Sequence, residues 1–233
     1  VINCKNSPGQ INIDRLKKYC KEIGLMQEGP FWFFQDYTLS NQIHYYNNLQ
    51  AADILFVHNE IDKKYYQGIT PGKRVLILPS LMVEDPISIE QLSSPKERTG
   101  IMIGGNMRSW YGGFDSFIVA KSITDNIYSP KMGQRSEEEE KLGINQLPFL
   151  EWNKWIVELS KRKIGVHLMR TYAAGTFALN CAYLGIPCIG YDSLDTQSKC
   201  HTSTTVKLGE ILEARNLIRK LEEDKDFYNK LRG

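Results

Sequence analysis

The stretch from Lys163 to Asp192, KIGVHLMRTYAAGTFALNCAYLGIPCIGYD, decides the fold of this chain. Its residues from Ile164 to Met169 form a short, largely apolar run, as is typical of a strand that a parallel sheet buries on both faces. A second short apolar run, from Cys188 to Tyr191, predicts another such strand. The connection between the two is long enough to hold a helix, so the stretch predicts a strand–helix–strand unit.

The connection begins with a small-residue turn, Ala173-Ala174-Gly175, where backbone N–H groups face outward without bulky side chains. Thr176 then opens a helix over Phe177 to Leu184. Gly185 and Pro187 end that helix before the second strand. A loop that enters a helix at the carboxyl end of a parallel strand favours anions, so the sequence predicts a phosphorylated ligand here.

Length and composition exclude several classes of protein. The chain has 233 residues and a net charge of +2, which argues against a general nucleic-acid or membrane surface. No apolar run approaches the roughly 20 residues that a membrane helix needs. The five cysteines form no C-x-x-C pair, and Cys200-His201 lacks further metal ligands at suitable spacing, so we expect a reducing cytoplasm and no metal site.

The order of strands and helices predicts an α/β protein with two Rossmann-like domains and parallel sheets flanked by helices. Residues 1–81 alternate short strands, among them Phe31 to Phe34, with helices, but supply only part of such a domain. Residues 82–99 read as a linker, and residues 100–233 as the second domain, with a strand expected at Leu147 to Leu150. The first residues, VINCKNSPGQ, lack a methionine and a signal peptide, so we expect a fragment whose upstream part is missing.

Four residues of the opening stretch carry a family resemblance. Gly175, Leu179, Gly185 and Pro187 match a pattern of strand, Glu-Gly-x-Gly turn, helix with Leu-Glu-Ala, and Gly-x-Pro-Val. The pattern is similar to the nucleotide-sugar-binding segment of glycosyltransferases with the GT-B fold, in particular the large retaining family four. The two glutamates of that family's Glu-x7-Glu motif fall at Tyr172 and Asn180. Ala52-Asp53-Ile54 likewise resembles the end of a GT-B N-terminal domain.

The resemblance implies transfer of a sugar from a nucleoside diphosphate sugar to an acceptor hydroxyl, on a saccharide or a lipid-linked acceptor. It implies no bound metal and no cofactor, since the nucleotide sugar is itself the substrate. The predicted nucleotide-sugar-binding residues are Gly105, Asn106, Arg108, Trp152, Arg170, Gly175, Thr176, Phe177 and Asn180. No catalytic base is assigned.

Each of these residues also has a structural interpretation. Gly104-Gly105-Asn106 either admits a ligand to the backbone or forms a tight turn. Arg108 supplies the first cation of the family's Arg and Lys pair, whose Lys position is Tyr111 here. Arg170 either grips a diphosphate or is a surface arginine at a strand end.

Three further positions are ambiguous in the same way. Thr176 is a phosphate donor, an N-cap, or both. Asn180 is a sugar ligand or an ordinary polar helix residue, and Trp152 covers a nucleobase or packs on a neighbouring helix. His167, inside an apolar strand, is expected to be a core histidine with satisfied hydrogen bonds.

Two rival functions remain open at this point. One is a GT-B relative that epimerises or hydrolyses a nucleotide sugar. The other is a non-catalytic Rossmann-like module that binds a nucleotide or a protein. Loss of the acidic pair favours the module, while Arg170 and Gly175 favour a donor site.

Overall fold

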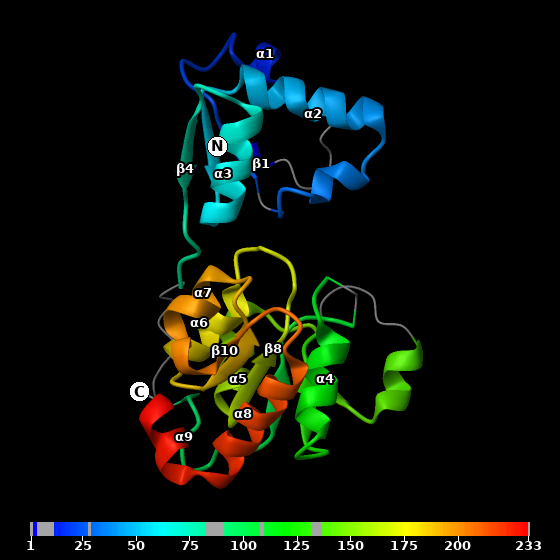
Figure 1. Cartoon of the computed structure of the whole chain (residues 1–233), viewed down its shortest axis with the longest axis vertical. Coiled ribbons are helices and arrows are strands. Elements are labelled where there is room, and N and C mark those ends of the chain that lie inside the picture. The colour runs from blue at the N-terminus through cyan, green and yellow to red at the C-terminus, as the bar shows by residue number, and fades with distance from the viewer. Residues whose placement is uncertain are drawn as a thin grey trace. The chain divides into compact units, whose positions relative to one another are not determined.

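The computed structural model describes residues 2–3, 12–27, 29–82, 91–107, 110–131 and 137–232. Its internal contacts divide the chain into two compact units, residues 1–80 with 172–174 and residues 81–171 with 175–233 (Figure 1). Both units carry parallel strands with helices between them, which confirms the predicted α/β class.

The first unit is built around a parallel sheet with strand order β1-β2-β3-β4. Its strands are β1 (Ile2–Asn3), β2 (Gly24–Met26), β3 (Ile54–Val57) and β4 (Arg74–Ile77). Its helices are α1 (Ile13–Leu16), the 3-10 helix η1 (Phe33–Asp36), α2 (Leu39–Ala51) and α3 (Glu60–Ile69). Leu25, Leu55 and Tyr45 are fully buried in its core, so the sheet is covered by its helices.

The predicted strand from Phe31 to Phe34 is wrong, since these residues form a turn and the start of η1. Pro30, directly before them, has no N–H to donate to a neighbouring strand. The N–H of Phe31 donates to the Asp62 carboxylate at 3.0 Å instead of joining a strand. The aromatic ring of Phe31 stacks on Tyr65 with ring centres 4.5 Å apart, so tertiary packing overrides the local strand propensity.

The second unit contains a larger parallel sheet, whose described strands follow the order β10-β9-β8-β5-β6-β7. They are β5 (Ile101–Ile103), β6 (Ile127–Ser129), β7 (Asn145–Gln146), β8 (Ile164–His167), β9 (Cys188–Tyr191) and β10 (Thr205–Val206). Every residue of β5, β8 and β9 is buried. This confirms the prediction that the apolar runs of the opening stretch lie in the centre of a parallel sheet.

Helices cover both faces of this sheet. They are α4 (Gly113–Lys121), η3 (Glu137–Leu142), α5 (Trp152–Ser160), α6 (Thr176–Tyr183), α7 (Asp195–Cys200), η4 (Thr202–Thr204), α8 (Ile211–Glu223) and α9 (Lys225–Leu231). Successive residues of a strand point to opposite faces of the sheet, so they pack against different helices. Ile101 and Ile103 pack with α4 and α8, which lie side by side (Figure 1), whereas Met102 packs with α5 and α6.

The strand predicted at Leu147 to Leu150 is also wrong. The pairing with β6 begins earlier, at Asn145, and its last backbone bond runs from the N–H of Leu147 to Ser129 O at 3.0 Å. Pro148 has no N–H to continue the ladder, so the chain leaves the sheet there. The helix α5 begins four residues later, at Trp152.

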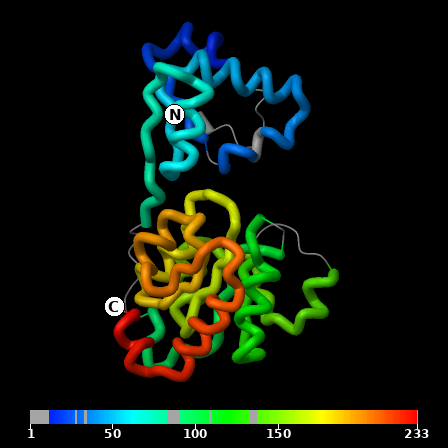
Figure 2. The backbone as a smooth tube through the Cα atoms, viewed as in Figure 1, coloured from blue at the N-terminus to red at the C-terminus, as the bar shows by residue number. Residues whose placement is uncertain are grey.

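Residues 91–99, which the sequence predicts as part of the linker, contact the second unit. The N–H of Ser93 donates to Ser160 Oγ at 3.1 Å, and that of Thr99 to Lys161 O at 2.9 Å. In Figure 2 the red helix α9 lies beside the green segment that leads into β5. The remaining residues of the predicted linker, apart from Met82, lie outside the described residues.

Candidate functional site

The sheet of the second unit has a point where its strand order reverses. The chain passes from β5 to β6 on one side, and later returns to place β8 on the other side of β5. The loops after β5 and β8 therefore leave the same sheet edge in opposite directions. Such a switch point, at the carboxyl ends of parallel strands, is where open α/β sheets bind their ligands.

The loop after β5 contains two glycines at this point, and neighbouring residues fill the space that their Cβ atoms would occupy. A Cβ atom on Gly104 would lie 2.6 Å from Cγ of His167 and 2.7 Å from Cδ1 of Phe177. Gly105 has a φ of 82°, which a residue with a side chain adopts only at a cost. Both positions therefore require glycine, and Asn106, which follows them, is buried.

His167 lies under this glycine loop at the end of β8. Its ring is 5% exposed and meets the ring of Phe177 edge-on, with centres 5.4 Å apart. Neither ring nitrogen has a hydrogen-bond partner among the residues that the structure describes. Burial lowers the pKa of His167 to about 4, so the imidazole is neutral near pH 7. The predicted burial is confirmed, but the predicted satisfied hydrogen bonds are not found.

The N-terminus of α6 faces the same sheet edge. Its N-cap residue is Gly175, with a φ of 66°, and no side chain caps its first turn. Side-chain oxygens of Thr38, Asn59 and Asp224 cap α2, α3 and α9, whereas α4, α5, α7 and α8 lack a side-chain cap as α6 does. The first N–H groups of α6 therefore keep their capacity to donate to an anion.

Side-chain hydroxyls tie the loops of this edge to one another. Ser116 Oγ accepts from the N–H of Leu168 at 2.9 Å and donates to Gly112 O at 2.8 Å, which joins the start of α4 to the end of β8. Thr171 Oγ1 donates to Trp110 O at 3.1 Å and thereby joins the loops after β8 and β5.

Two further hydroxyls act in the same way from the loop after β9. Ser193 Oγ donates to Met169 O at 2.6 Å, and Thr196 Oγ1 donates to Gly175 O at 2.7 Å. A set of loops fixed by mutual hydrogen bonds holds its backbone donors in place before a ligand arrives. These four hydroxyls are not recognisable as site residues from the sequence, because each joins a loop that lies far away in the sequence.

Arg170 follows β8 by three residues, and its side chain is exposed. It makes no hydrogen bond or ion pair with any residue in the described ranges, so its guanidinium remains available for a ligand. Thr176 is likewise exposed at the first position of α6. Arg108 lies outside the described residues.

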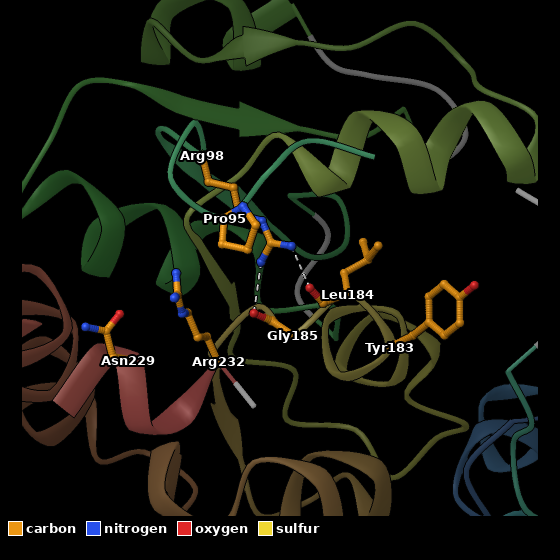
Figure 3. A pocket seen from close by; sticks show the side chains of 7 residues that line it. All are labelled: Pro95, Arg98, Tyr183, Leu184, Gly185, Asn229 and Arg232. Carbon is orange, nitrogen blue, oxygen red and sulfur yellow. Dashed lines mark hydrogen bonds between the residues drawn. The ribbon is translucent and has the colours of Figure 1, made fainter. Parts of the chain in front are cut away.

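A separate pocket of about 480 Å³ lies at the opposite, amino edge of the sheet (Figure 3). Its walls include Tyr183 and Leu184 at the end of α6, and Asn229 and Arg232 in and after α9. Arg98 there donates to Leu184 O at 2.7 Å and to Gly185 O at 2.9 Å, as the dashed lines in Figure 3 show. Because these carbonyls end α6, the pocket surrounds a helix C-terminus held by an arginine rather than the switch point.

Within the described ranges, no group of three or more His, Cys, Asp and Glu side chains is arranged to hold a metal ion. His201, next to Cys200, is instead bonded through Nε2 to Ala178 O at 2.9 Å. No described helix combines the length and apolar character that crossing a membrane requires.

Comparisons place this architecture among known proteins. No protein-family model matches the sequence, and no curated protein matches it. Among solved structures, sucrose-phosphate synthase from Thermosynechococcus elongatus is similar with a TM-score of 0.68 and 14% identity, over 94% of this chain and 63% of its own. WaaG, a glycosyltransferase involved in lipopolysaccharide biosynthesis, is similar with a TM-score of 0.69 and 15% sequence identity. That match covers 94% of this chain and 74% of WaaG. Anabaena HepE, solved in complex with UDP and glucose, has a TM-score of 0.69 and 11% sequence identity. The match covers 91% of this chain and 65% of HepE.

The chain has the GT-B fold. It spans 63% of the length of the synthase, so it corresponds to part of such a GT-B protein. Its structural neighbours are glycosyltransferases, and at these identities the likeness establishes the fold.

Three predicted site residues of this GT-B chain take part in packing: Asn180, Trp152 and Phe177. The amide of Asn180, oriented so that its nitrogen donates to Thr176 O at 3.2 Å, accepts from Trp155 Nε1 at 3.0 Å through its oxygen. The residue is 8% exposed. Its polar atoms therefore join α6 to α5. The pattern of family four has a glutamate at this position.

Trp152 is half-buried and packs against the apolar layer between the sheet, α5 and α6. Phe177, in the same layer, is buried against Gly104 and His167. The structure therefore brings together six of the predicted positions at the switch point: Gly105, Asn106, Arg170, Gly175, Thr176 and Phe177.

Proposed function

We propose that this chain is the donor-binding part of a glycosyltransferase that moves a sugar from a nucleoside diphosphate sugar to an acceptor hydroxyl. The observation that carries the proposal is the combination at the switch point of a side-chain-free glycine loop and an uncapped helix N-terminus. The first turn of α6 supplies backbone N–H donors to an anion, at the edge where α/β sheets bind nucleotides.

The diphosphate is the part of the donor that this edge suits. The first N–H groups of α6 point along the positive end of the helix dipole, and the exposed Arg170 adds a full charge. In glycosyl transfer, negative charge grows on the diphosphate as the bond to the sugar breaks. Fixed donors at that position therefore stabilise the leaving group, and hydroxyls such as Thr196 hold the loop that carries them.

The acceptor that we propose is a hydroxyl of a saccharide or of a lipid-linked saccharide, the class that the sequence resemblance implies. UDP sugars are the first donors to test, since HepE was solved in complex with UDP and glucose. A cytoplasmic location and independence from a bound metal or cofactor belong to the same proposal.

One observation favours a second candidate, a nucleotide-binding module without transfer activity. The acidic positions of family four are Tyr172 and Asn180 here, and the Asn180 amide is occupied by Trp155 and Thr176. A chain that binds UDP-glucose but neither transfers nor hydrolyses its glucose would support this module. Hydrolysis without any acceptor would instead support the hydrolase alternative.

The test is a thermal-shift titration of the 233-residue chain with UDP, GDP and ADP. A ligand that binds only the folded state stabilises it by about 2.7 kcal/mol at 100 times its dissociation constant. For a unit of this size that corresponds to a rise in melting temperature of about 5–10 °C. We expect a shift with one of the three nucleotides.

Arg170→Ala should weaken that shift, whereas Arg219→Ala, a change at an exposed arginine of α8, should leave it unaltered. Both arginines are exposed, so neither change should lower the melting temperature of the free protein by more than about 2 °C. Absence of a shift with all three nucleotides, from a folded sample, would refute the donor-binding proposal.

A further inference from the structure

The pocket at the amino edge of the second sheet takes no part in the proposed donor site. Its volume of about 480 Å³ is that of a small-ligand site, and its described walls belong to the second unit alone (Figure 3). The donor site lies at the other end of α6, a helix of eight residues that is about 12 Å long. One phosphate group therefore cannot occupy both places.

Two cations and no carboxylate line the described part of this pocket. Arg98 and Arg232 supply the charges, and Asn229 supplies an exposed amide that can donate hydrogen bonds. In Figure 3 the guanidinium of Arg98 points at the end of α6, whereas Asn229 and Arg232 project from α9 and the residue that follows it. The pocket therefore carries a net positive charge.

The position of Arg98 is fixed by the protein itself. Its guanidinium donates to Leu184 O at 2.7 Å and to Gly185 O at 2.9 Å. These carbonyls carry the partial negative charge of a helix C-terminus, so they offset part of the charge of Arg98.

Arg232 is the cation that the protein leaves uncompensated. Its guanidinium makes no hydrogen bond or ion pair within the part of the chain that the structure describes. Glu222, near the end of α8, is already paired with Lys163 at 2.7 Å. Burial lowers the pKa of Arg98, and the positive charge of Arg232 lowers it further, so the two cations lie close enough to repel each other. A bound anion would remove this repulsion.

We propose that this pocket binds a phosphate group, with Arg232 as its contacting cation and Arg98 as a fixed charge beside it. A guanidinium presents its donors in a planar fork that fits two phosphate oxygens. A phosphate monoester carries about 1.5 to 2 negative charges at pH 7, which two arginines match better than they match the single charge of a carboxylate. The pocket leaves room for the rest of a small monoester beside Pro95 and Tyr183.

The experiment is a calorimetric titration of the 233-residue chain at pH 7 in a buffer free of phosphate. The probes are inorganic phosphate and glycerol 3-phosphate, with glycerate as a carboxylate of similar size and glycerol as a neutral control. We expect both phosphates to bind, glycerate to bind about tenfold more weakly, and glycerol not to bind. Tighter binding of glycerol 3-phosphate assigns the pocket to a monoester, whereas tighter binding of inorganic phosphate assigns it to the free ion; both results support the site.

Two variants with matched controls locate the bound phosphate. Arg232→Met should raise its dissociation constant about tenfold or more, the typical effect of losing a hydrogen bond between charged groups. Arg219→Met, at an exposed arginine of α8 outside the pocket, should leave the constant unchanged. Asn229→Asp, which adds a carboxylate to the pocket, should also weaken binding. Asn216→Asp makes the same change of charge on the exposed face of α8 and should not.

The outcomes are independent of the proposed function. Phosphate binding that is weakened by Arg170→Ala but not by Arg232→Met would place the phosphate at the switch point, overturn this inference and leave the donor site standing. Failure of both phosphates to bind the folded chain, or equally tight binding of glycerate, would also overturn it. Binding that only the Arg232 and Asn229 variants weaken supports the pocket, whether or not UDP, GDP or ADP binds to the chain.

Discussion

Acidification from pH 7 to pH 5 should destabilise the second unit through His167. The pKa of this histidine is about 4 in the folded protein and 6.5 in an unfolded chain. Between these values the unfolded chain binds a proton that the folded chain does not, so the free energy of unfolding falls as the pH falls. Integration from pH 7 to pH 5 gives a loss of about 2 kcal/mol from this one group.

Other groups with shifted pKa values can be separated from this effect. Burial also lowers the pKa of His201, but that loss is common to the wild type and to a His167 variant. The pKa of Asp53 is lowered below 3.8, mainly by the hydrogen bond from the N–H of Ile23. The ionised Asp53 carboxylate therefore stabilises the fold at every pH between 5 and 7. This stabilisation is lost only when the pH falls below 3.8.

The assay is urea unfolding at pH 7, 6 and 5, followed by tryptophan fluorescence, since three of the four tryptophans lie in the second unit. In His167→Gln the loss of stability between pH 7 and pH 5 should be smaller than in the wild type by about 2 kcal/mol. His58→Gln should retain the wild-type difference. Equal losses in the wild type and in His167→Gln would show that the imidazole is already satisfied or hydrated, and would refute the reasoning.

Three further predictions concern the frame of the site. Gly112→Ala should destabilise the chain by about 3 kcal/mol or more in urea unfolding, because its φ is 63° and the new Cβ would lie 1.8 Å from Leu168 O. Gly72→Ala, also at positive φ but with open space around it, should cost only about 1 kcal/mol, and an equal cost at both sites would contradict the steric argument. Ser116→Ala should cost about 1–3 kcal/mol by the same measurement, since it leaves the buried N–H of Leu168 without its acceptor, and a neutral effect would show that another acceptor replaces the hydroxyl. Arg98→Met should lower the free energy of unfolding by about 1–3 kcal/mol through loss of two bonds at the end of α6, with unchanged nucleotide affinity, and reduced affinity would link the two sheet edges.

The sequence predicts the parallel sheet well, because burial on both faces leaves a direct trace in composition. The apolar runs that begin at Ile164 and Cys188 each predict a buried strand, and Pro187 predicts the break before the second of them. The prediction at Phe31 to Phe34 is wrong, because an aromatic run has strand propensity whether or not its N–H groups find a neighbouring strand. The acceptor that decides the case, Asp62, lies 31 residues away.

Part of the geometry of the candidate site also leaves a trace in the sequence. Glycines such as Gly105 and Gly175 mark loops where backbone is exposed, and the structure places them at one sheet edge. The Asn180 contact with Trp155 depends on the packing of two helices, which sequence spacing does not specify. The unpartnered ring of His167 is still harder to predict, because the sequence records which groups are polar but not which of them fail to find a partner.

The contacts of residues 91–99 determine where the second unit can be cut from the chain. A fragment that starts at Gly100 would begin at the first strand, yet it would lose Arg98, which holds the end of α6, and the backbone bonds of Ser93 and Thr99. The carbonyls of Leu184 and Gly185 would then be left to solvent just before β9. A second unit that folds by itself must therefore include these nine residues, so residues 91–99 belong to its stable body rather than to a connecting segment.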